Sequence, residues 1–244
     1  MTGMFPAMNA PRADVGWIVR TTINVVRRRA IGLLMIGLPT LWLPSLLAAL
    51  LPPELAPLRY ATGMPALVFF GGASLLAYRE ITGGERVGGL RALGVGLRRF
   101  VTLFLIAMVS GFMAVVGLAL LVVPGLFVLA AFMAATTAAV AEDKGSAAAM
   151  DRAWLLSRGS RGRLAGLMGI ALVAYVLMLV FALLVGAIVS LIGLMDTVLP
   201  VDQLVMAPII NMALFSMTTV GATAAYVNLR TLKEGEIDLA EAFA

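Results

Sequence analysis

Residues 100–141 read FVTLFLIAMVSGFMAVVGLALLVVPGLFVLAAFMAATTAAVA, a run of 42 residues without one charged side chain. About 20 apolar residues in a helix cover the ~30 Å of hydrocarbon in a bilayer, so this run is long enough to cross twice. Pro124 and Gly125 interrupt the run, and a Pro-Gly pair is typical of a tight turn. The stretch therefore predicts two membrane-spanning helices, 100–123 and 126–141, joined by a hairpin.

The composition of the whole chain points the same way. Hydrophobic residues make up 61% of the 244 residues and charged residues 13%, whereas an average soluble domain is about 25% charged and about half apolar. Apolar length predicts an all-α, polytopic membrane protein with six transmembrane helices: 30–51, 61–76, 100–123, 126–141, 164–194 and 204–227. The fifth span must tilt or kink, because 31 residues of helix reach roughly 46 Å.

The distribution of Lys and Arg predicts the orientation of the spans. Of the 18 basic residues, 17 fall in the segment 1–29, the 77–99 loop, the 142–163 loop and the tail, and only Arg59 falls on the other side. Cytoplasmic loops are enriched in Lys and Arg, so both termini are expected in the cytoplasm. If residues 126–141 formed only a re-entrant stub, there would be five spans, and the basic residues of the tail would lie outside. Because the net charge of +5 serves as this orientation signal, nucleic acid is not an expected partner.

The 29 residues before the first span form too long a lead-in for an ordinary signal peptide, so the first span is expected to stay in the membrane. The chain is then one integral-membrane domain: an interfacial segment 1–29, a six-helix bundle 30–227 and a cytoplasmic tail 228–244.

The segment before the first span predicts an amphipathic helix. Apolar positions recur at helical spacing between residues 15 and 26, Arg20 and Arg27 fall on the opposite face, and Asp14 can cap the start. A basic amphipathic helix with a Trp is typical of one that lies in the headgroup plane, so Trp17, Arg27 and Arg28 are candidate contacts with lipid or a partner. The alternative is a plain cytoplasmic extension of the first span.

The sequence offers little for catalysis. It contains no Cys and no His, which excludes disulfides, thiol chemistry, Cys/His zinc sites and triads that need an imidazole. Every charged residue falls outside the spans or at their edges, which argues against a proton relay. No catalytic residue, metal or cofactor is therefore expected. Hydroxyls at depth are expected to serve packing, and the one amide there, Asn211, an interhelical hydrogen bond or a substrate contact.

The 142–163 loop holds a more informative stretch, which continues into the fifth span: AAAMDRAWLLSRGSRGRLAG at residues 147–166. A helix is expected over about 146–156, on which Met150 and Trp154 share a face with Ala147. That face is expected to pack onto the cytoplasmic ends of the spans, and Arg152 to turn toward water. Trp154 suits this depth because an indole has an apolar ring to bury and one N–H to satisfy.

A basic cluster follows this helix: Arg158, Arg161 and Arg163. An Arg at headgroup height contributes on the order of 1 kcal/mol toward anionic lipid. The three side chains are expected to meet anionic headgroups, or else Glu142 and Asp143.

Two stretches of the second half resemble a bacterial membrane-protein group. Glu142 and the later AMDRAWLLSRG (149–159) are similar to an acidic residue followed by A-L-x-R-S-W-x-L-T-R-G, and YVNLRTLKEG (226–235) is similar to Y-x-x-L-R-x-x-K-E-G. The group includes the multi-helix membrane domain attached to some glycerophosphodiester phosphodiesterases and the YciC-type proteins. The resemblance implies a multi-pass protein of the bacterial inner (cytoplasmic) membrane. It carries over no phosphodiesterase activity, because no hydrolase domain is seen beside it.

These features together favour a non-catalytic inner-membrane protein. It is expected to bind lipid through anionic headgroups, or partner membrane helices or copies of itself, and so to assemble or stabilise a larger membrane complex. The alternative is a transporter or channel for a lipid or small amphiphile. An intramembrane hydrolase fits least well.

Overall fold

The computed structural model describes residues 14–50, 52–55, 63–120, 122–191 and 207–234, and this part of the chain is helical without any β-strand. In chain order the elements are α1 (Val15–Arg28), α2 (Ala30–Gly37), the π-helical turn η1 (Leu38–Trp42), α3 (Leu43–Leu50), the 3₁₀ turn η2 (Pro53–Leu55), α5 (Pro65–Ile81), α6 (Gly89–Arg98), α7 (Phe100–Leu120), α8 (Val122–Phe132), α9 (Ala135–Ala141), α10 (Ser146–Ser157), α11 (Arg161–Leu191) and α13 (Ala207–Glu234). The predicted all-α class is confirmed.

Among the described residues, four segments are long and apolar enough to cross a membrane: Ala30–Ala48, Phe100–Gly117, Val123–Ala141 and Pro208–Glu234. The pair Ser146–Ser157 and Arg161–Leu177 makes a fifth if it counts as one span, although it is bent by 102°. This is the pattern of a multi-pass membrane protein, but the six expected spans are not confirmed. Helix α5, at the expected second span, has only 17 residues and includes Arg79 and Glu80.

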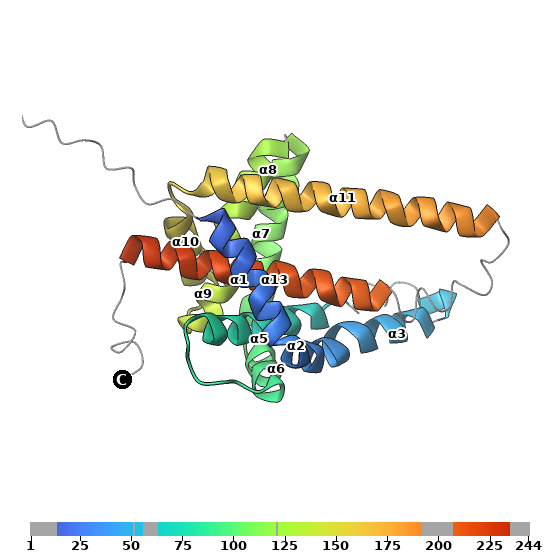
Figure 1. Cartoon of the computed structure of the whole chain (residues 1–244), viewed down its shortest axis with the longest axis horizontal. Helices are drawn as coiled ribbons and strands as arrows, with labels where there is room; N and C mark the ends of the chain where they lie inside the picture. Colours follow the sequence, from blue (N-terminus) through green and yellow to red (C-terminus); the bar gives the residue numbers. More distant parts are fainter. Residues whose placement is uncertain (1–13, 51, 56–62, 121, 192–206, 235–244) are drawn as a thin grey trace, which may run out of the picture.

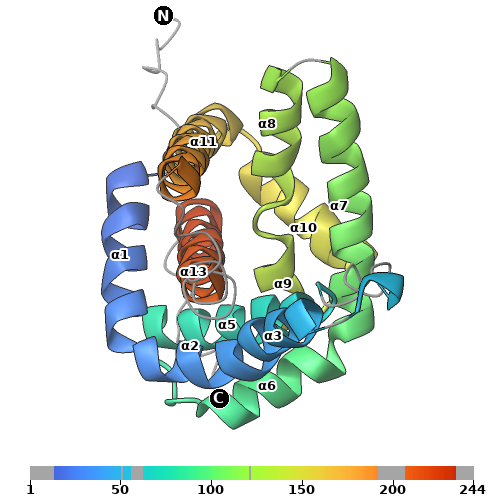
Figure 2. The same cartoon turned by 90° about the vertical axis from the view of Figure 1, so that its right-hand side faces the viewer.

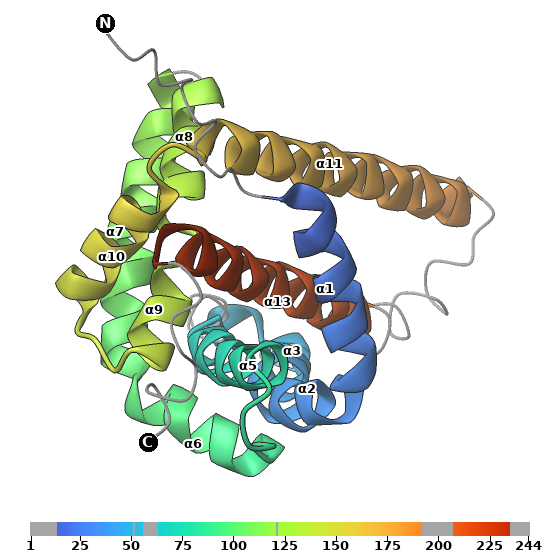
Figure 3. The ribbon, with the colours of Figure 1, turned by 60° about the vertical axis from the view of Figure 1, so that its left-hand side comes forward.

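Helix α13 lies at the centre of the fold, with α1, α5, α9 and α11 around it (Figures 2 and 3). Its buried face carries small residues and one large aromatic ring: Val220, Thr223, Ala224, Ala225, Tyr226 and Leu229. Alanines of α9 and α10 complete the same core, among them Ala135, Ala138, Ala149 and Ala153. Small side chains let helix backbones approach closely, which is how membrane helices gain packing contacts.

Helices α7 and α8 form a pair that runs across α11 and α13 instead of alongside them (Figure 1). Helix α7 ends at Leu120 and α8 begins at Val122, so Pro124 and Gly125 lie in the first turn of α8 and not in the hairpin that the sequence predicted. A proline is tolerated in a first turn because its missing N–H has no partner there anyway. Gly125 allows close approach, since a Cβ on Gly117 would lie 2.9 Å from the Gly125 Cα.

The predicted amphipathic helix is present as α1. Asp14 caps it by accepting a hydrogen bond from the Trp17 backbone N–H at 3.0 Å, and its buried side chains include Ile18 and Val25. That face packs on α13, and the Asp14 backbone N–H donates to Asn228 at 3.1 Å. Non-helical backbone at Arg29 (φ −108°, ψ 15°) separates α1 from α2, so α1 is not a straight extension of the first apolar segment.

The predicted 77–99 loop contains an additional helix, α6, packed tightly on α5. Glycines make this contact possible: a Cβ on Gly71 would lie 3.0 Å from the Gly96 Cα, and one on Gly72 would lie 3.0 Å from the Ala92 carbonyl oxygen. This helix is amphipathic and only 10 residues long, so apolar length, which predicts membrane spans, does not indicate it.

Hydroxyls inside the fold serve packing, as expected. Thr137 of α9 and Thr223 of α13 hydrogen-bond each other at 3.1 Å, and Ser110 and Thr219 donate to carbonyls of their own helices. Asn211 does not make the expected interhelical bond: it is exposed on α13, without a hydrogen-bond partner in the described part of the chain.

Candidate functional site

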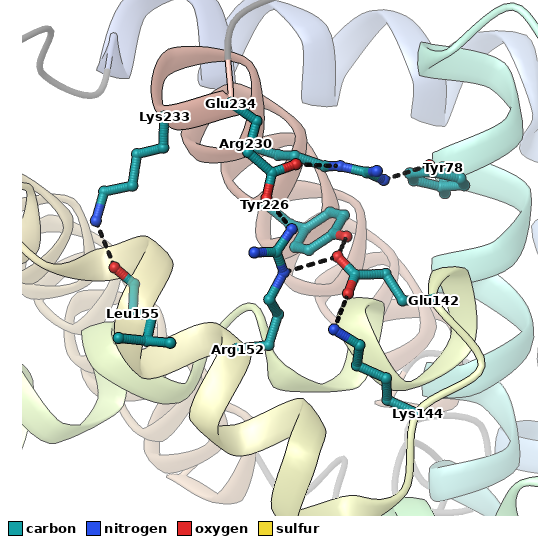
Figure 4. Close-up of polar contacts among 9 residues, drawn as sticks. All are labelled: Tyr78, Glu142, Lys144, Arg152, Leu155, Tyr226, Arg230, Lys233 and Glu234. Carbon is teal, nitrogen blue, oxygen red and sulfur yellow. Dashed lines mark hydrogen bonds and ion pairs between the residues drawn. The ribbon is translucent and has the colours of Figure 1, made fainter. Parts of the chain in front are cut away.

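A group of polar side chains gathers where α13 ends, beside α10, the α9–α10 connection and the end of α5 (Figure 4). Seven of them form what we term the charge network: Tyr78, Glu142, Lys144, Arg152, Tyr226, Arg230 and Glu234. They come from four places in the sequence, so the network joins segments that are far apart along the chain.

Glu142 is the hub of the charge network. Its carboxylate accepts hydrogen bonds from Arg152 Nε at 3.0 Å and from the Tyr226 hydroxyl, and Lys144 Nζ lies 2.6 Å away. Burial by itself raises the pKa of the Glu142 carboxyl, but the hydrogen bonds from its three partners outweigh burial and lower the pKa to about 2. Glu142 is therefore ionised at neutral pH.

The second carboxylate, Glu234, extends the charge network along α13. It accepts a hydrogen bond from Arg152 Nη2 and another from Arg230 Nε at 3.0 Å, and Arg230 Nη1 donates to the Tyr78 hydroxyl at 3.1 Å. Arg152 thus bridges the two carboxylates with a side chain that is 23% exposed. The prediction that Arg152 turns toward water is wrong.

A second group, which we term the cationic cluster, consists of Arg158, Arg161 and Lys233. Arg161 Nη2 donates to the Trp154 carbonyl oxygen at 2.9 Å, and Lys233 Nζ donates to the next carbonyl, that of Leu155. Arg158 is exposed beside them, close enough for its charge to act on both Arg161 and Lys233. In the described part of the chain, no carboxylate forms an ion pair with any of the three.

Trp154 connects this cluster to the interior. Its ring packs against Phe132 of α8 in a tilted arrangement, with centroids 5.9 Å apart and ring planes at 31°, and the Arg161 guanidinium lies 3.5 Å from the indole centroid. Trp154 is 39% exposed and is therefore held between two partners, not in open water. The buried face of α10 is Ala149, Ala153 and Leu156, with Met150 at its edge. It is rotated from the predicted face, and Ala147 is exposed.

Of the two kinds of partner predicted for the basic cluster, Glu142 and Asp143 are paired with other cations, and the anionic headgroups stay a prediction. Lys144 and Arg152 pair with Glu142, and Arg99 pairs with Asp143. The reason is reach: α10 separates Glu142 from residues 158–163, while Arg152 projects from the middle of that helix.

The other residues predicted to contact lipid or a partner belong neither to the charge network nor to the cationic cluster. Trp17 is partly buried against the core, and Arg27 is exposed at the end of α1. Arg28 lies 3.9 Å from Glu80 and is 76% exposed, so that pair is weak. Arg163 is exposed near the start of α11.

An apolar cavity of about 320 Å³ lies among α5, α7, α8, α9, α11 and α13. Its lining includes Phe70, Leu103, Leu129, Phe132, Met168 and Ala222, together with five hydroxyl residues: Ser74, Ser110, Thr136, Thr218 and Thr219. Ser110, Thr218 and Thr219 donate to carbonyls of their own helices, which leaves the cavity mainly apolar. No charged residue lines it within the described structure.

The cavity lies next to both the charge network and the cationic cluster. Ser74 and Ala222 line it, and each precedes a tyrosine of the charge network, Tyr78 and Tyr226, by one helical turn. Phe132 lines the cavity and also contacts the Trp154 ring, which belongs to the neighbourhood of the cationic cluster. Within the described residues, no group of three His, Cys, Asp or Glu side chains is placed to hold a metal ion.

Sequence reasoning identified Trp154, Arg158 and Arg161, but it missed the charge network. One signal was present: Arg152, Tyr226, Arg230 and Glu234 fall inside the two stretches on which the resemblance rests, and Glu142 is the acidic residue that precedes the first. Two distant stretches that carry complementary charges are candidates for pairing in space. Comparison of the chain with protein-family models, with curated proteins and with solved structures finds no match.

Proposed function

We propose that this protein is a non-catalytic, multi-pass inner-membrane protein that binds a membrane lipid, with part of an acyl chain in the apolar cavity. The observation that carries the proposal is the cavity itself, which is mainly apolar and lined by no charged residue in the described structure. Hydrocarbon is the ligand that gains most in such a site, because burial of apolar surface is favourable and no unpaired polar group results.

The size of the cavity supports this ligand. An engineered apolar cavity of about 150 Å³ holds one benzene ring, and about 320 Å³ is roughly twice that. By this ratio the cavity takes on the order of twelve carbons, which is a large part of one acyl chain and too little for a whole phospholipid. The headgroup then lies outside the cavity.

The proposed topology has six spans with both termini in the cytoplasm, and it rests on the distribution of Lys and Arg. Helix α5 serves as the second span, and its 17 residues reach about 26 Å, so the bilayer has to thin slightly around it. The bacterial inner membrane and the likeness to phosphodiesterase-attached membrane domains remain part of the proposal.

The proposal is tested by a substitution that fills the cavity with a larger side chain. Ala222 lines it, whereas Ala171 is exposed on α11 and is not among the lining residues. We expect Ala222→Phe to lower the lipid that stays bound to the purified protein after an extensive detergent wash, measured per mole of protein by mass spectrometry. Ala171→Phe is the matched control and retains the wild-type amount. Equal retention by the wild type and Ala222→Phe would refute the proposal.

The same preparations test the alternatives. Movement of a fluorescent lipid between leaflets, faster in vesicles with the protein than without it, would favour a transporter. Hydrolysis of glycerophosphodiesters by purified protein that Asp151→Asn abolishes would overturn the non-catalytic assignment; we expect no turnover. Co-purification of a second protein in a fixed ratio would favour a complex subunit.

A further inference from the structure

The cationic cluster differs from the charge network beside it in one respect. In the charge network, Lys144 and Arg152 contact Glu142, and Arg152 and Arg230 contact Glu234. Arg158, Arg161 and Lys233 have no such carboxylate among the described residues, although their charges act on one another. Three cations held together without a counter-charge favour an anion from outside the chain.

We infer that the cationic cluster binds the phosphate of an anionic phospholipid whose acyl chain enters the apolar cavity. This inference rests on the proposed function, because it assigns a headgroup site to the same lipid.

Free donors are available in the cluster. A guanidinium carries five N–H groups, and Arg161 uses Nε for Ser157 at 3.2 Å and one N–H of Nη2 for the Trp154 carbonyl. The remaining N–H groups of Arg161 and the whole exposed guanidinium of Arg158 are left for a ligand. Guanidinium groups suit phosphate oxygens because their planar forks donate two parallel hydrogen bonds.

A chain of side-chain contacts links the cluster to the cavity. Arg161 lies on the Trp154 ring, Trp154 lies on Phe132, and Phe132 lines the cavity. On the other side, Met168 lines the cavity two turns after Arg161 on α11. A molecule with a phosphate at Arg161 and a hydrocarbon chain beyond Phe132 satisfies both ends.

The charge of the cluster also selects among lipids. A zwitterionic headgroup would bring its own cation close to Arg158, Arg161 and Lys233, and no carboxylate among the described residues is paired with these three cations to receive it. A headgroup with net negative charge, such as phosphatidylglycerol, meets no such repulsion. The occupant is thus an anionic phospholipid in preference to a zwitterionic one.

The test is a titration of the detergent-solubilised full-length protein with phosphatidylglycerol or with phosphatidylcholine of the same acyl chains, read by native mass spectrometry. We expect the first phosphatidylglycerol to bind roughly 10- to 100-fold more tightly than phosphatidylcholine, from the usual contribution of three surface cations near anionic lipid. The variant Arg158→Gln/Arg161→Gln/Lys233→Gln is expected to bind both lipids about equally. A charge-matched control, Arg86→Gln/Arg91→Gln/Arg98→Gln, removes three exposed cations elsewhere and keeps the preference.

Two further measurements test the roles of Arg158 and of the acyl chain separately. Arg158→Gln alone removes no hydrogen bond seen in the structure and should fold normally, yet it should lower the preference several-fold. Glycerol phosphate, which has the headgroup anion without the chain, should not displace the bound lipid at equal concentration. Displacement would show that the chain contributes nothing, and it would overturn the inference.

Failure of the headgroup site and failure of the cavity are distinguishable. If both lipids bind to the wild type with equal affinity, and Ala222→Phe weakens both, the cavity stands and the headgroup site is wrong. If Ala222→Phe has no effect on either lipid, the proposed function itself is wrong. A loss of preference in the charge-matched control equal to that in the cluster variant would reduce the effect to net charge, and it too would overturn the site.

Discussion

Glu142→Gln removes one charge from the centre of the charge network and keeps the size of the side chain. It weakens contacts with Arg152 at 3.0 Å and Lys144 at 2.6 Å, and a third with the Tyr226 hydroxyl. A hydrogen bond to a charged group is worth about 1.5–3 kcal/mol, and breaking a fully buried ion pair costs about 3–5 kcal/mol. The Glu142 side chain is 11% exposed and that of Arg152 is 23% exposed, and Arg152 keeps Glu234. We therefore expect the free energy of unfolding to fall by about 2–3 kcal/mol.

Equilibrium unfolding by SDS in mixed micelles measures this change. Glu85→Gln is the control, since Glu85 is exposed and a substitution there should change stability by less than about 0.5 kcal/mol. A double-mutant cycle with Arg152→Gln should give a coupling energy of about 1–2 kcal/mol, because the two side chains are in direct contact. Additive effects, or a loss no larger than that of Glu85→Gln, would refute the account of Glu142 as the hub.

The dependence on pH gives an independent measurement of the same interaction. The pKa of Glu142 is lowered from its ordinary value of 4.5 to about 2 in the folded protein. A carboxyl whose pKa is lower when folded stabilises the protein above its unfolded pKa and loses that contribution as the pH falls. The wild type should thus lose at most about 3 kcal/mol between pH 4.5 and pH 2 that Glu142→Gln does not lose. Parallel acid profiles for the two proteins would contradict this.

Two other outcomes can be checked with single substitutions. Gly96→Ala should destabilise the protein by about 1–3 kcal/mol in the same SDS assay, because its Cβ would press on the Val68 carbonyl of α5 and lie 3.1 Å from the Gly72 nitrogen. Gly94→Ala on the same helix meets nothing within 4 Å and should be neutral or slightly stabilising; equal effects would show that the α5–α6 contact is not tight. Cysteines at Gly83 and Gly145, both exposed positions of this Cys-free chain, should react with an impermeant maleimide only from the cytoplasmic side. Labelling from the outside would reverse the proposed topology.

The helical class was predictable because apolar length and the lack of interior charge leave a membrane helix as the main solution for the backbone. Residues 100–141 show which features apolar length predicts and which it does not. Helix α7 (Phe100–Leu120) lies within the first predicted span, whereas the second corresponds to two helices, α8 (Val122–Phe132) and α9 (Ala135–Ala141), of which α8 already includes Pro124 and Gly125. Proline is equally compatible with a turn and with a first helical turn, so the sequence pattern does not separate the two.

The arrangement of the helices was not predictable in the same way. Nothing in the apolar pattern indicates that α7 and α8 run across α11 and α13 (Figure 1), since α7 and α8 contain no charged residue and lack a marked face. The close contact of α5 with α6 depends on glycines at positions 71, 72 and 96 that meet only after folding. A glycine pattern within one helix predicts close packing but does not name the neighbour.

The candidate site was predicted in part for a related reason. Arg158, Arg161 and Trp154 could be identified because cations and an indole beside an apolar span are typical of a membrane interface. Arg152 was misjudged because its partners, Glu142 and Glu234, lie ten and 82 positions away. Helical spacing places Arg152 on the face opposite Met150, and only the end of α13 turns that face into an interior one.

The charge network and the cationic cluster share the last turn of α13, where Glu234 belongs to the former and Lys233 to the latter. Because Arg152 and Arg230 hold Glu234, they also fix the position of Lys233 against the Leu155 carbonyl. Loosening the network should therefore weaken headgroup selection without removing any cation of the cluster. We expect Glu142→Gln to lower the preference for phosphatidylglycerol over phosphatidylcholine by about two- to fivefold, which corresponds to a coupling of about 0.5–1 kcal/mol. Native mass spectrometry measures this ratio of affinities on the folded protein, so a lower stability alone does not change it. If Glu142→Gln unfolds more easily and yet selects lipids as the wild type does, the network holds the helices together and takes no part in positioning Lys233.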